Sequence, residues 1–465
     1  MTASDTITAT GLDAAIADLQ NLYGDRIQTG RSIREQHAHT TTPIPNQPPD
    51  AVVFPQTTEE VAETVRICAR NAIPVIPFGT GTSLEGQVNA PNGGISLDFS
   101  RMNRVLSINS EDLDCVVEPG ITREDLNHAL RDQGLFFPVD PGANASIGGM
   151  AATRASGTNA VRYGTMKDNI LGLTAVLADG RIVKTGTRAR KTSAGYDITR
   201  LLIGAEGTLG IITGITLRLH GIPEKISAAT CSFPDVHSAC RSVTTAIQMG
   251  LPIARIELLN ALQVQACNAY SKLDLPPTPL LLLEFHGTEA SVAEQAETFG
   301  EVASEFSGSA FAWTSSTEER NRLWKARHDA YFSVLPLRPG ARPIATDVCV
   351  PVSRLADCVT EAEREADKLG FPAPIVGHVG DGNFHFSLLV MPDDPAEYER
   401  AKDFIGWLND LAISMEGTCT GEHGIGQGKQ PYLRRELGDT VDVMIAIKKA
   451  LDPQNILNPG KIFEI

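Results

Sequence analysis

The chain has 465 residues, and 40 Lys and Arg against 56 Asp and Glu give it a formal net charge of −16. This length predicts two or three domains, and a composition of 42% hydrophobic and 21% charged residues excludes a disordered chain. Nucleic acids and anionic membrane surfaces attract clustered Lys and Arg, so the acidic balance argues against both as main partners.

The first 48 residues are expected to form a helix at residues 12–23 followed by a polar lead-in. His37 and His39 lie in this lead-in without a recognisable partner, so we expect both at the surface. No basic residue precedes an apolar stretch, which argues against a secretory signal or an Arg-rich transit peptide. No apolar run approaches the roughly 20 residues of a membrane span. We therefore expect a cytoplasmic protein without a membrane span, and we leave peripheral association with the inner membrane open.

Residues 49–221 are expected to form the first domain, which begins with strand, helix, strand and a glycine-rich loop. Thr57 and Glu60 have the spacing of a capping box, which predicts the start of a helix. A strand at 114–118 precedes a second capped helix that begins at Thr122. The pair Asp179-Gly180 predicts the turn of a β-hairpin.

Three segments of this domain are rich in small residues: the loop after the second strand (79–86), residues 141–170 and residues 201–213. The loop is neither a Rossmann fingerprint, because Leu84 occupies the third glycine position, nor a Walker A loop, because Gln87 follows where Lys is needed. The three segments are either ordinary tight turns or the lining of one extended ligand, since small residues permit backbone contact along it.

Residues 222–425 alternate helices with strands such as 253–258 and 280–285, and they contain a histidine pair. In GHVGDGNFH, a hairpin closed by Val379 and Phe384 would make His378 and His385 a directly opposed cross-strand pair, with Cβ atoms about 4.5–5.5 Å apart. Glu422, in TCTGEHGIG, is the expected third ligand of a His2Glu metal site with an open position. Such a set accepts Zn, Mn, Fe or Co, of which we expect Zn or Mn.

The segment EERNRLWKARHDAYF predicts a helix on which Arg320, Trp324, Arg327 and Tyr331 share one face. Such a face is either a solvated basic surface or a clamp for a substrate carboxylate, which guanidinium binds bidentately. The last segment, 426–465, is expected to contain a helix at 439–450 and to return to the first domain.

Four motifs together resemble the FAD-binding domain of the vanillyl-alcohol oxidase (PCMH) type of flavoprotein: PFGTGTSLEG, DPGANAS, RYGT and GAEGTLGIIT. The resemblance implies an α+β fold, with a two-subdomain FAD-binding domain and an α/β cap (substrate) domain with a mainly antiparallel sheet. It also implies FAD contacts, with the pyrophosphate on the first loop, for Phe78, Gly79, Thr80, Gly81, Thr82, Ser83, Gly86, Pro141, Gly142, Ser146, Gly148, Gly149, Thr153, Gly157, Thr158, Val161, Tyr163, Gly164, Glu206, Gly210, Ile211, Ile212 and Asn458. Residues 78–87 contain no His or Cys, so we expect non-covalent FAD.

Five further motifs closely resemble the FAD-dependent D-lactate dehydrogenases of the cytochrome-linked, mitochondrial type: RLWKARH, TDVCVP, GHVGDGNFH, CTGEHGIG and NPGKI. This resemblance covers the chain from about residue 30 onward. It implies that His378, His385 and Glu422 bind a divalent metal, that His423 is the base, and that Arg320 and Trp324 contact substrate, with Arg327 a weaker candidate. Hydroxyglutarate-oxidising relatives have Asn where Ser387 stands and Lys where Leu335 stands, which favours a substrate without a second carboxylate.

The sequence thus leads us to expect metal-assisted oxidation of a D-2-hydroxy acid, foremost D-lactate, to the 2-keto acid, with hydride passing to FAD N5. Glycolate and D-2-hydroxyglutarate are alternative substrates. A His2Glu metallohydrolase and a non-enzymatic nucleotide-binding module are alternatives of other classes. The eight cysteines form no C-x-x-C pair, haem-attachment motif or iron–sulfur array. Electrons must therefore leave to a quinone, a cytochrome or an electron-transfer protein; a homodimer is left open.

Overall fold

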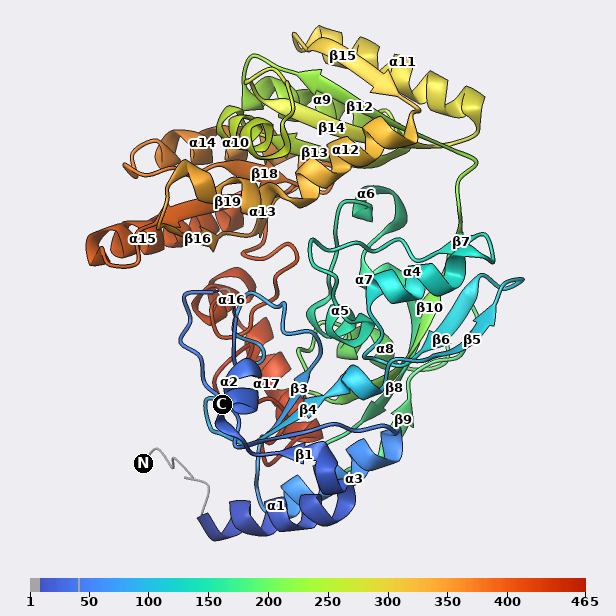
Figure 1. Ribbon diagram of the computed structural model, residues 1–465, viewed down its shortest axis with the longest axis vertical. Coiled ribbons are helices and arrows are strands. Elements are labelled where there is room, and N and C mark those ends of the chain that lie inside the picture. Colours follow the sequence, from blue (N-terminus) through green and yellow to red (C-terminus); the bar gives the residue numbers. More distant parts are fainter. Residues whose placement is uncertain (1–8, 41) are drawn as a thin grey trace. The chain divides into compact units, whose positions relative to one another are not determined.

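The computed structural model describes residues 9–40 and 42–465, which fold into two compact α+β units (Figure 1). Unit 1 consists of the described residues of Met1–Ser156 together with Gly164–Ile222 and Glu422–Ile465. Unit 2 consists of Gly157–Tyr163 and Pro223–Gly421. Each unit is therefore assembled from separate stretches of the chain.

The first part of unit 1 is a four-stranded sheet in the order β1-β2-β4-β3. Strands β2 and β3 pair with β4 in parallel, and β1 pairs with β2 in antiparallel fashion. The elements are α1 (Ala9–Tyr23), β1 (Ile27–Gln28), α2 (Arg31–Gln36), β2 (Ala51–Val53), α3 (Thr58–Arg70), β3 (Val75–Phe78) and β4 (Ile95–Asp98). Helix α3 begins as its capping signal predicts, because the Thr57 side chain accepts a hydrogen bond from Glu60 N.

The second part of unit 1 is an antiparallel sheet in the order β5-β6-β10-β8-β9. Its elements are β5 (Val105–Asn109), β6 (Asp114–Val117), α4 (Arg123–Arg131), α5 (Ile147–Thr153), α7 (Met166–Asn169), β8 (Ile170–Val176), β9 (Ile182–Lys184), α8 (Ile198–Leu202) and β10 (Ile211–Arg218), with the small pair β7 (Leu135–Phe136) and β11 (His220–Gly221). The hairpin predicted at Asp179-Gly180 is confirmed: Val176 pairs with Ile182, and Gly180 has φ +76°.

The C-terminal stretch completes unit 1 with α16 (Gln430–Leu437) and α17 (Thr440–Leu451). Beyond them the backbone runs along β3, where Val75 N donates to Ile456 O and Asn458 N donates to Val75 O. The predicted return of the chain to the first domain therefore takes the form of backbone pairing beside the strand that leads into the glycine loop.

Unit 2 is built on one antiparallel sheet in the order β15-β12-β14-β13-β18-β19-β16, with β17 also pairing with β19. Its strands are β12 (Lys225–Ser232), β13 (Ile253–Leu259), β14 (Leu280–Gly287), β15 (Ser309–Thr314), β16 (Arg342–Ala345), β17 (Val348–Cys349), β18 (Ile375–Gly377) and β19 (Asn383–Val390). Its helices are α6 (Ala160–Tyr163), α9 (Val236–Gln248), α10 (Ala261–Ser271), α11 (Glu289–Glu305), α12 (Thr317–His328), α13 (Ala330–Ser333), α14 (Leu355–Ala366) and α15 (Pro395–Ser414).

The two faces of this sheet pack against different helices. Ile256 and Leu258 of β13 belong to a large apolar cluster with residues of α9, α11, α14 and α15. Leu259 belongs to a smaller cluster with residues of α10 and α12, including Trp324. Because side chains alternate along a strand, Arg255 and Glu257 point to the same face as Leu259, toward α10 and α12.

Segment 157–163 belongs to unit 2, whereas its position in the sequence places it within the FAD-binding domain. Polar contacts explain this. Arg162 Nη1 donates to Pro252 O and to His286 O, and the Tyr163 hydroxyl lies 2.7 Å from His286 Nδ1. No helix of the described chain is both long and apolar enough to cross a bilayer.

Candidate functional site

In unit 1, the loop after β3 lies directly against the start of α5. A Cβ atom added to Gly79 would lie 2.2 Å from Ser146 Oγ, and one added to Gly149 would lie 3.0 Å from the same oxygen. Ser83 Oγ and Ser146 Oγ are buried and have no hydrogen-bond partner among the described residues. Buried hydroxyls are almost always paired. A glycine-lined surface with unpaired hydroxyl donors fits the phosphate oxygens of a dinucleotide such as FAD.

Glu206 and Asn458 connect the loops of unit 1 by hydrogen bonds to backbone groups. The buried Glu206 carboxylate accepts hydrogen bonds from Ile425 N at 2.7 Å and Gly426 N at 2.8 Å. Burial raises the pKa of Glu206 to about 7, although both backbone donors oppose the shift. Asn458 Nδ2 donates to the carbonyls of Gln87 and Glu206. These two predicted FAD residues thus hold the loops in place through the backbone.

The remaining predicted FAD residues fall into three groups. Ile211 and Ile212 are buried in the apolar clusters of unit 1. Others lie on turns or beside the glycine loop. A Cβ atom added to Gly81 would lie 2.8 Å from the Phe78 ring, and the Thr153 hydroxyl donates to Gly149 O. A third group, Gly157, Thr158, Val161 and Tyr163, belongs to unit 2.

His37 is buried, so the prediction that it lies at the surface is wrong. Its Nε2 lies 2.8 Å from Asp98 Oδ2, its Nδ1 lies 2.7 Å from Ile33 O, and its ring packs against Phe78 with centroids 4.3 Å apart. Its main partner is 61 residues away along the chain, which the polar character of the local segment does not reveal.

In unit 2, His378 and His385 lie close together but not directly opposite each other. His385 pairs with Val376, while His378 lies beyond the end of β18, where its carbonyl accepts from Asn383 N. The pair is therefore diagonal, and the predicted direct opposition is wrong. The turn explains the difference, because Gly382 adopts φ +81° and packs against Val350 O. The two rings still approach to 5.5 Å between centroids, at 80° to each other.

The Nδ1 atoms of both histidines face oxygen acceptors. His378 Nδ1 lies 2.7 Å from Glu257 Oε1, and His385 Nδ1 lies 2.9 Å from Thr346 O. Because a carbonyl oxygen only accepts, the His385 contact places the hydrogen on Nδ1 and leaves the Nε2 lone pair for a ligand. An imidazole held at one nitrogen by a carboxylate or carbonyl is typical of metal-binding histidines. This donor set fits a divalent metal.

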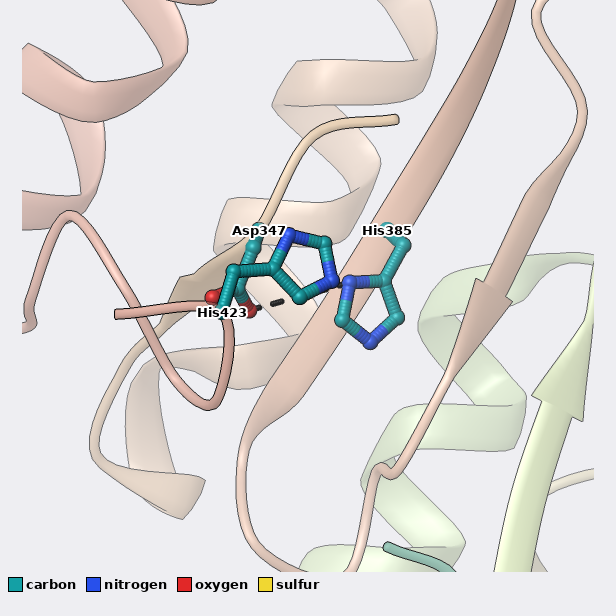
Figure 2. A group of neighbouring side chains, drawn as sticks. All are labelled: Asp347, His385 and His423. Atoms are coloured by element: carbon teal, nitrogen blue, oxygen red, sulfur yellow. Dashed lines mark ion pairs between the residues drawn. The ribbon is translucent and has the colours of Figure 1, made fainter. Parts of the chain in front are cut away.

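Asp347 joins His385 to the segment that leads to Glu422. Figure 2 shows Asp347 beside His385, with Oδ1 at 3.7 Å from Nδ1; His423, also drawn there, belongs to unit 1. Asp347 accepts hydrogen bonds from Asn383 Nδ2 and Thr420 Oγ1. A Cβ atom added to Gly421 would lie 2.2 Å from Asn383 Nδ2. The backbone at Gly421, the last residue of unit 2, therefore passes close to the first residue of β19.

Glu422 and His423 begin the last stretch of unit 1. The Glu422 carboxylate accepts from Ser156 Oγ at 3.0 Å. The His423 carbonyl accepts from Gln87 Nε2 at 2.8 Å, and its Nδ1 lies 3.8 Å from Glu85 Oε1. The predicted base is therefore held beside the end of the glycine loop, at Glu85 and Gln87.

Helix α12 carries the three predicted substrate residues, and they differ in their surroundings. The Arg327 guanidinium pairs with Glu257 at 2.6 Å. Trp324 is buried, with the Arg255 guanidinium 4.7 Å from its ring centroid. Arg320 is only partly buried, and its guanidinium has no ion pair or hydrogen bond within the part of the chain that the structure describes. The helix ends at His328 with Asp329 as its C-cap, so Tyr331 lies on α13 and the single face predicted as far as Tyr331 is wrong.

The motifs do not include Glu257, Arg255 or Glu284, which lie together on the α12 side of the sheet. Arg255 Nε lies 3.6 Å from Glu284 Oε1, which in turn lies 2.7 Å from His286 Nε2. The signal available in the sequence is alternation: IARIELL is an apolar strand with charged residues at two alternate positions, Arg255 and Glu257. Charged residues at alternate positions of a strand that is otherwise buried indicate a polar site on one face.

Comparison with known proteins gives consistent family matches. Residues 49–186 match the model of an FAD binding domain, and residues 222–462 match that of the C-terminal domain of FAD linked oxidases. The chain is 49% identical to a probable mitochondrial D-lactate dehydrogenase of Danio rerio (98% of this chain, 92% of that protein). It is 43% identical to the mitochondrial D-lactate dehydrogenase [cytochrome] of Arabidopsis thaliana (96% and 79%). The crystal structure of p-cresol methylhydroxylase with bound substrate has the same fold, with a TM-score of 0.81 at 19% identity over 99% of this chain and 98% of that one.

Proposed function

This chain belongs to the FAD-linked oxidase family, and from that premise we propose that it oxidises a D-2-hydroxy acid, foremost D-lactate, to the 2-keto acid. The family match confirms the resemblance seen in the sequence motifs and makes the chain an FAD-dependent dehydrogenase. The observation that carries the substrate class lies in unit 2, which contains two imidazoles with fixed Nδ1 atoms and the partly buried Arg320 guanidinium. Such groups suit a substrate that has both a hydroxyl and a carboxylate.

FAD would be held without a covalent bond by the glycine loop and the start of α5. The buried Ser83 and Ser146 hydroxyls are the donors we assign to its phosphate oxygens. When bound, FAD supplies the redox chemistry by accepting the hydride from C2 of the substrate. The names of the cytochrome-linked relatives support a separate electron acceptor, and we propose a cytochrome, a quinone or an electron-transfer protein.

His378, His385 and Glu422 would hold a divalent metal, Zn or Mn, which supplies Lewis acidity at the substrate hydroxyl. Glu422 follows directly on Gly421, which packs against Asn383 of the same strand as His385. His423 would take the proton of the hydroxyl group as general base.

Arg320 would bind the substrate carboxylate, and Trp324 would pack against the substrate. Arg327 is a poorer candidate, because its guanidinium is already paired with Glu257. Ser387 and Leu335 supply no cation for a second carboxylate, which favours D-lactate over D-2-hydroxyglutarate.

The proposal predicts that the purified protein carries a flavin spectrum and reduces an artificial electron acceptor with D-lactate. Steady-state assays with D- and L-lactate, glycolate and D-2-hydroxyglutarate would rank the substrates by kcat/KM. We expect D-lactate to rank first. A higher value for D-2-hydroxyglutarate or glycolate would overturn the substrate assignment, and a colourless, fully active preparation would overturn the flavin chemistry.

Replacing Arg320 by Met should raise the KM for D-lactate by about 10- to 100-fold, since a hydrogen bond to a charged group contributes about 1.5–3 kcal/mol. The matched control is Arg322→Met on the same helix, because Arg322 is exposed and donates to a backbone carbonyl, Lys272 O. We expect its KM to stay within about twofold of the wild type. An unchanged KM in Arg320→Met would show that this guanidinium does not contact the substrate.

A further inference from the structure

Glu257 is a buried carboxylate that divides its two oxygens between two partners. Its side chain is 0% exposed. Oε1 lies 2.7 Å from His378 Nδ1, and Oε2 lies 2.7 Å from Arg327 Nε and 2.6 Å from Arg327 Nη2. These contacts join β13 to α12 and to the turn after β18. Arg327 is 70 residues from Glu257 in the sequence, and His378 is 121 residues from it.

The core of unit 2 does not account for this carboxylate. Its neighbours on the strand, Ile256 and Leu258, point to the opposite face and fill the large apolar cluster. A buried carboxylate is costly unless it is paired, and replacing such pairs by apolar residues is often neutral for stability. The position of Glu257 therefore indicates a task at His378 rather than a contribution to packing.

The charge state of Glu257 is set by its partners. The Arg327 guanidinium, which is always protonated, places two N–H donors 2.7 and 2.6 Å from Oε2, and such a two-donor pair is formed with a carboxylate. An ionised carboxylate only accepts hydrogen bonds, so the hydrogen of His378 lies on Nδ1 and the lone pair lies on Nε2.

We infer that Glu257 is a positioning residue that orients His378 and fixes its tautomer, and that Arg327 acts through Glu257 rather than on the substrate. The inference rests on the proposed function, in which His378 is a metal ligand. Two arginines on the same face of α12, about two turns apart, thus have different roles: Arg327 neutralises the buried carboxylate, and Arg320 is left for the substrate.

The two histidines are consequently unequal ligands. A carboxylate bonded to an imidazole raises its basicity more than a neutral carbonyl does. His378 Nδ1 bonds to the Glu257 carboxylate at 2.7 Å, whereas His385 Nδ1 bonds to the Thr346 carbonyl and has the Asp347 carboxylate only at 3.7 Å. Loss of the Glu257 charge should therefore weaken metal binding even if the hydrogen bond to His378 survives.

The first test is Glu257→Gln, which keeps an oxygen acceptor of the same shape but removes the charge. The FAD-containing enzyme would be stripped with a chelator and titrated with Zn²⁺ alone against a chromophoric competitor. We expect Zn²⁺ affinity to fall about 10- to 100-fold, as for other partners of metal-binding histidines. The flavin spectrum and the KM for D-lactate should change little. Glu257→Asp, which keeps the charge but shortens the side chain, is the second variant, and it should also weaken Zn²⁺ binding.

Glu397→Gln is the matched control. Glu397 is a buried carboxylate of the same unit that accepts from both terminal nitrogens of Arg338 at 2.7 Å, and no histidine of the described chain bonds to it. The control removes the charge of an Arg-paired carboxylate without touching the proposed metal site. We expect wild-type Zn²⁺ affinity.

Variants of Arg327 test whether this side chain acts through Glu257 or contacts the substrate. Arg327→Met should lower Zn²⁺ affinity and kcat and leave KM nearly unchanged, and Arg327→Lys should partly restore both. A raised KM with wild-type Zn²⁺ affinity would make Arg327 a substrate contact and overturn the inference, as would unchanged affinity in the Glu257 variants. If the wild type itself takes up neither Zn²⁺ nor Mn²⁺, the proposed metal site fails, and that failure is visible before any substitution is made.

Discussion

Replacing His423 by alanine is expected to lower kcat for D-lactate by about 10²- to 10⁴-fold while FAD stays bound, because general-base catalysis contributes that much. Anaerobic stopped-flow mixing with D-lactate would follow the bleaching of the flavin, so that the reductive half-reaction is measured without the electron acceptor. The flavin spectrum of the resting variant would show whether the cofactor is retained.

The backbone around His423 should survive this substitution. Gln87 Nε2 bonds to the carbonyl of His423 rather than to its ring, and the next residue, Gly424, adopts φ +79° independently of the imidazole. His237→Ala on α9 is the control, because this half-exposed ring has only a distant partner, Asp357, at 3.9 Å. Flavin reduction at the wild-type rate in His423→Ala would remove His423 from the mechanism.

Gly426→Ala should be the most destabilising of these substitutions. Gly426 has φ +47°, a conformation that costs other residues roughly 1–2 kcal/mol. A Cβ atom there would also lie 2.1 Å from Glu85 O, a backbone atom that cannot easily move. Overpacking of this kind adds about 1–3 kcal/mol. Because Gly426 N also donates to Glu206 Oε2, the variant should release FAD at a lower temperature, which flavin fluorescence during heating would detect.

Gly134→Ala separates the two causes. Gly134, in the turn after α4, also has a positive φ, +68°, but no atom lies within 4 Å of the position that its Cβ would take. It should therefore show only the conformational cost of roughly 1–2 kcal/mol. Equal losses of stability in the two variants would mean that crowding against Glu85 does not matter.

Features with local signals could be predicted from the sequence. The caps at Thr57 and Thr122 and the turn at Asp179-Gly180 are confirmed, since each depends on residues within three or four positions. The cofactor domain and the cap with its antiparallel sheet followed from motif resemblance, and the fold and family matches bear them out.

Features that depend on distant partners could not be predicted. The burial of His37 requires Asp98, and the orientation of His378 requires Glu257 from another strand. The diagonal placement of His378 and His385 depends on how the turn at Gly382 packs against Val350. Segment 157–163 has the small residues of a cofactor loop, but its Arg162 and Tyr163 bond to unit 2. In each case the local pattern is compatible with two outcomes, and a long-range contact selects one.

The division of the chain also bears on the order in which the protein is made on the ribosome. All of unit 2 is synthesised before residue 422, whereas unit 1 needs residues 422–465, which include its last two helices and the backbone segment that bonds to Val75 of β3. Asn458 and Gly426, which brace the loops around Glu206, therefore emerge after the whole sheet of unit 2. The nascent chain can therefore complete the sheet of unit 2 before residues 422–465 are available to unit 1, and we expect FAD to bind only when synthesis of the chain is nearly complete.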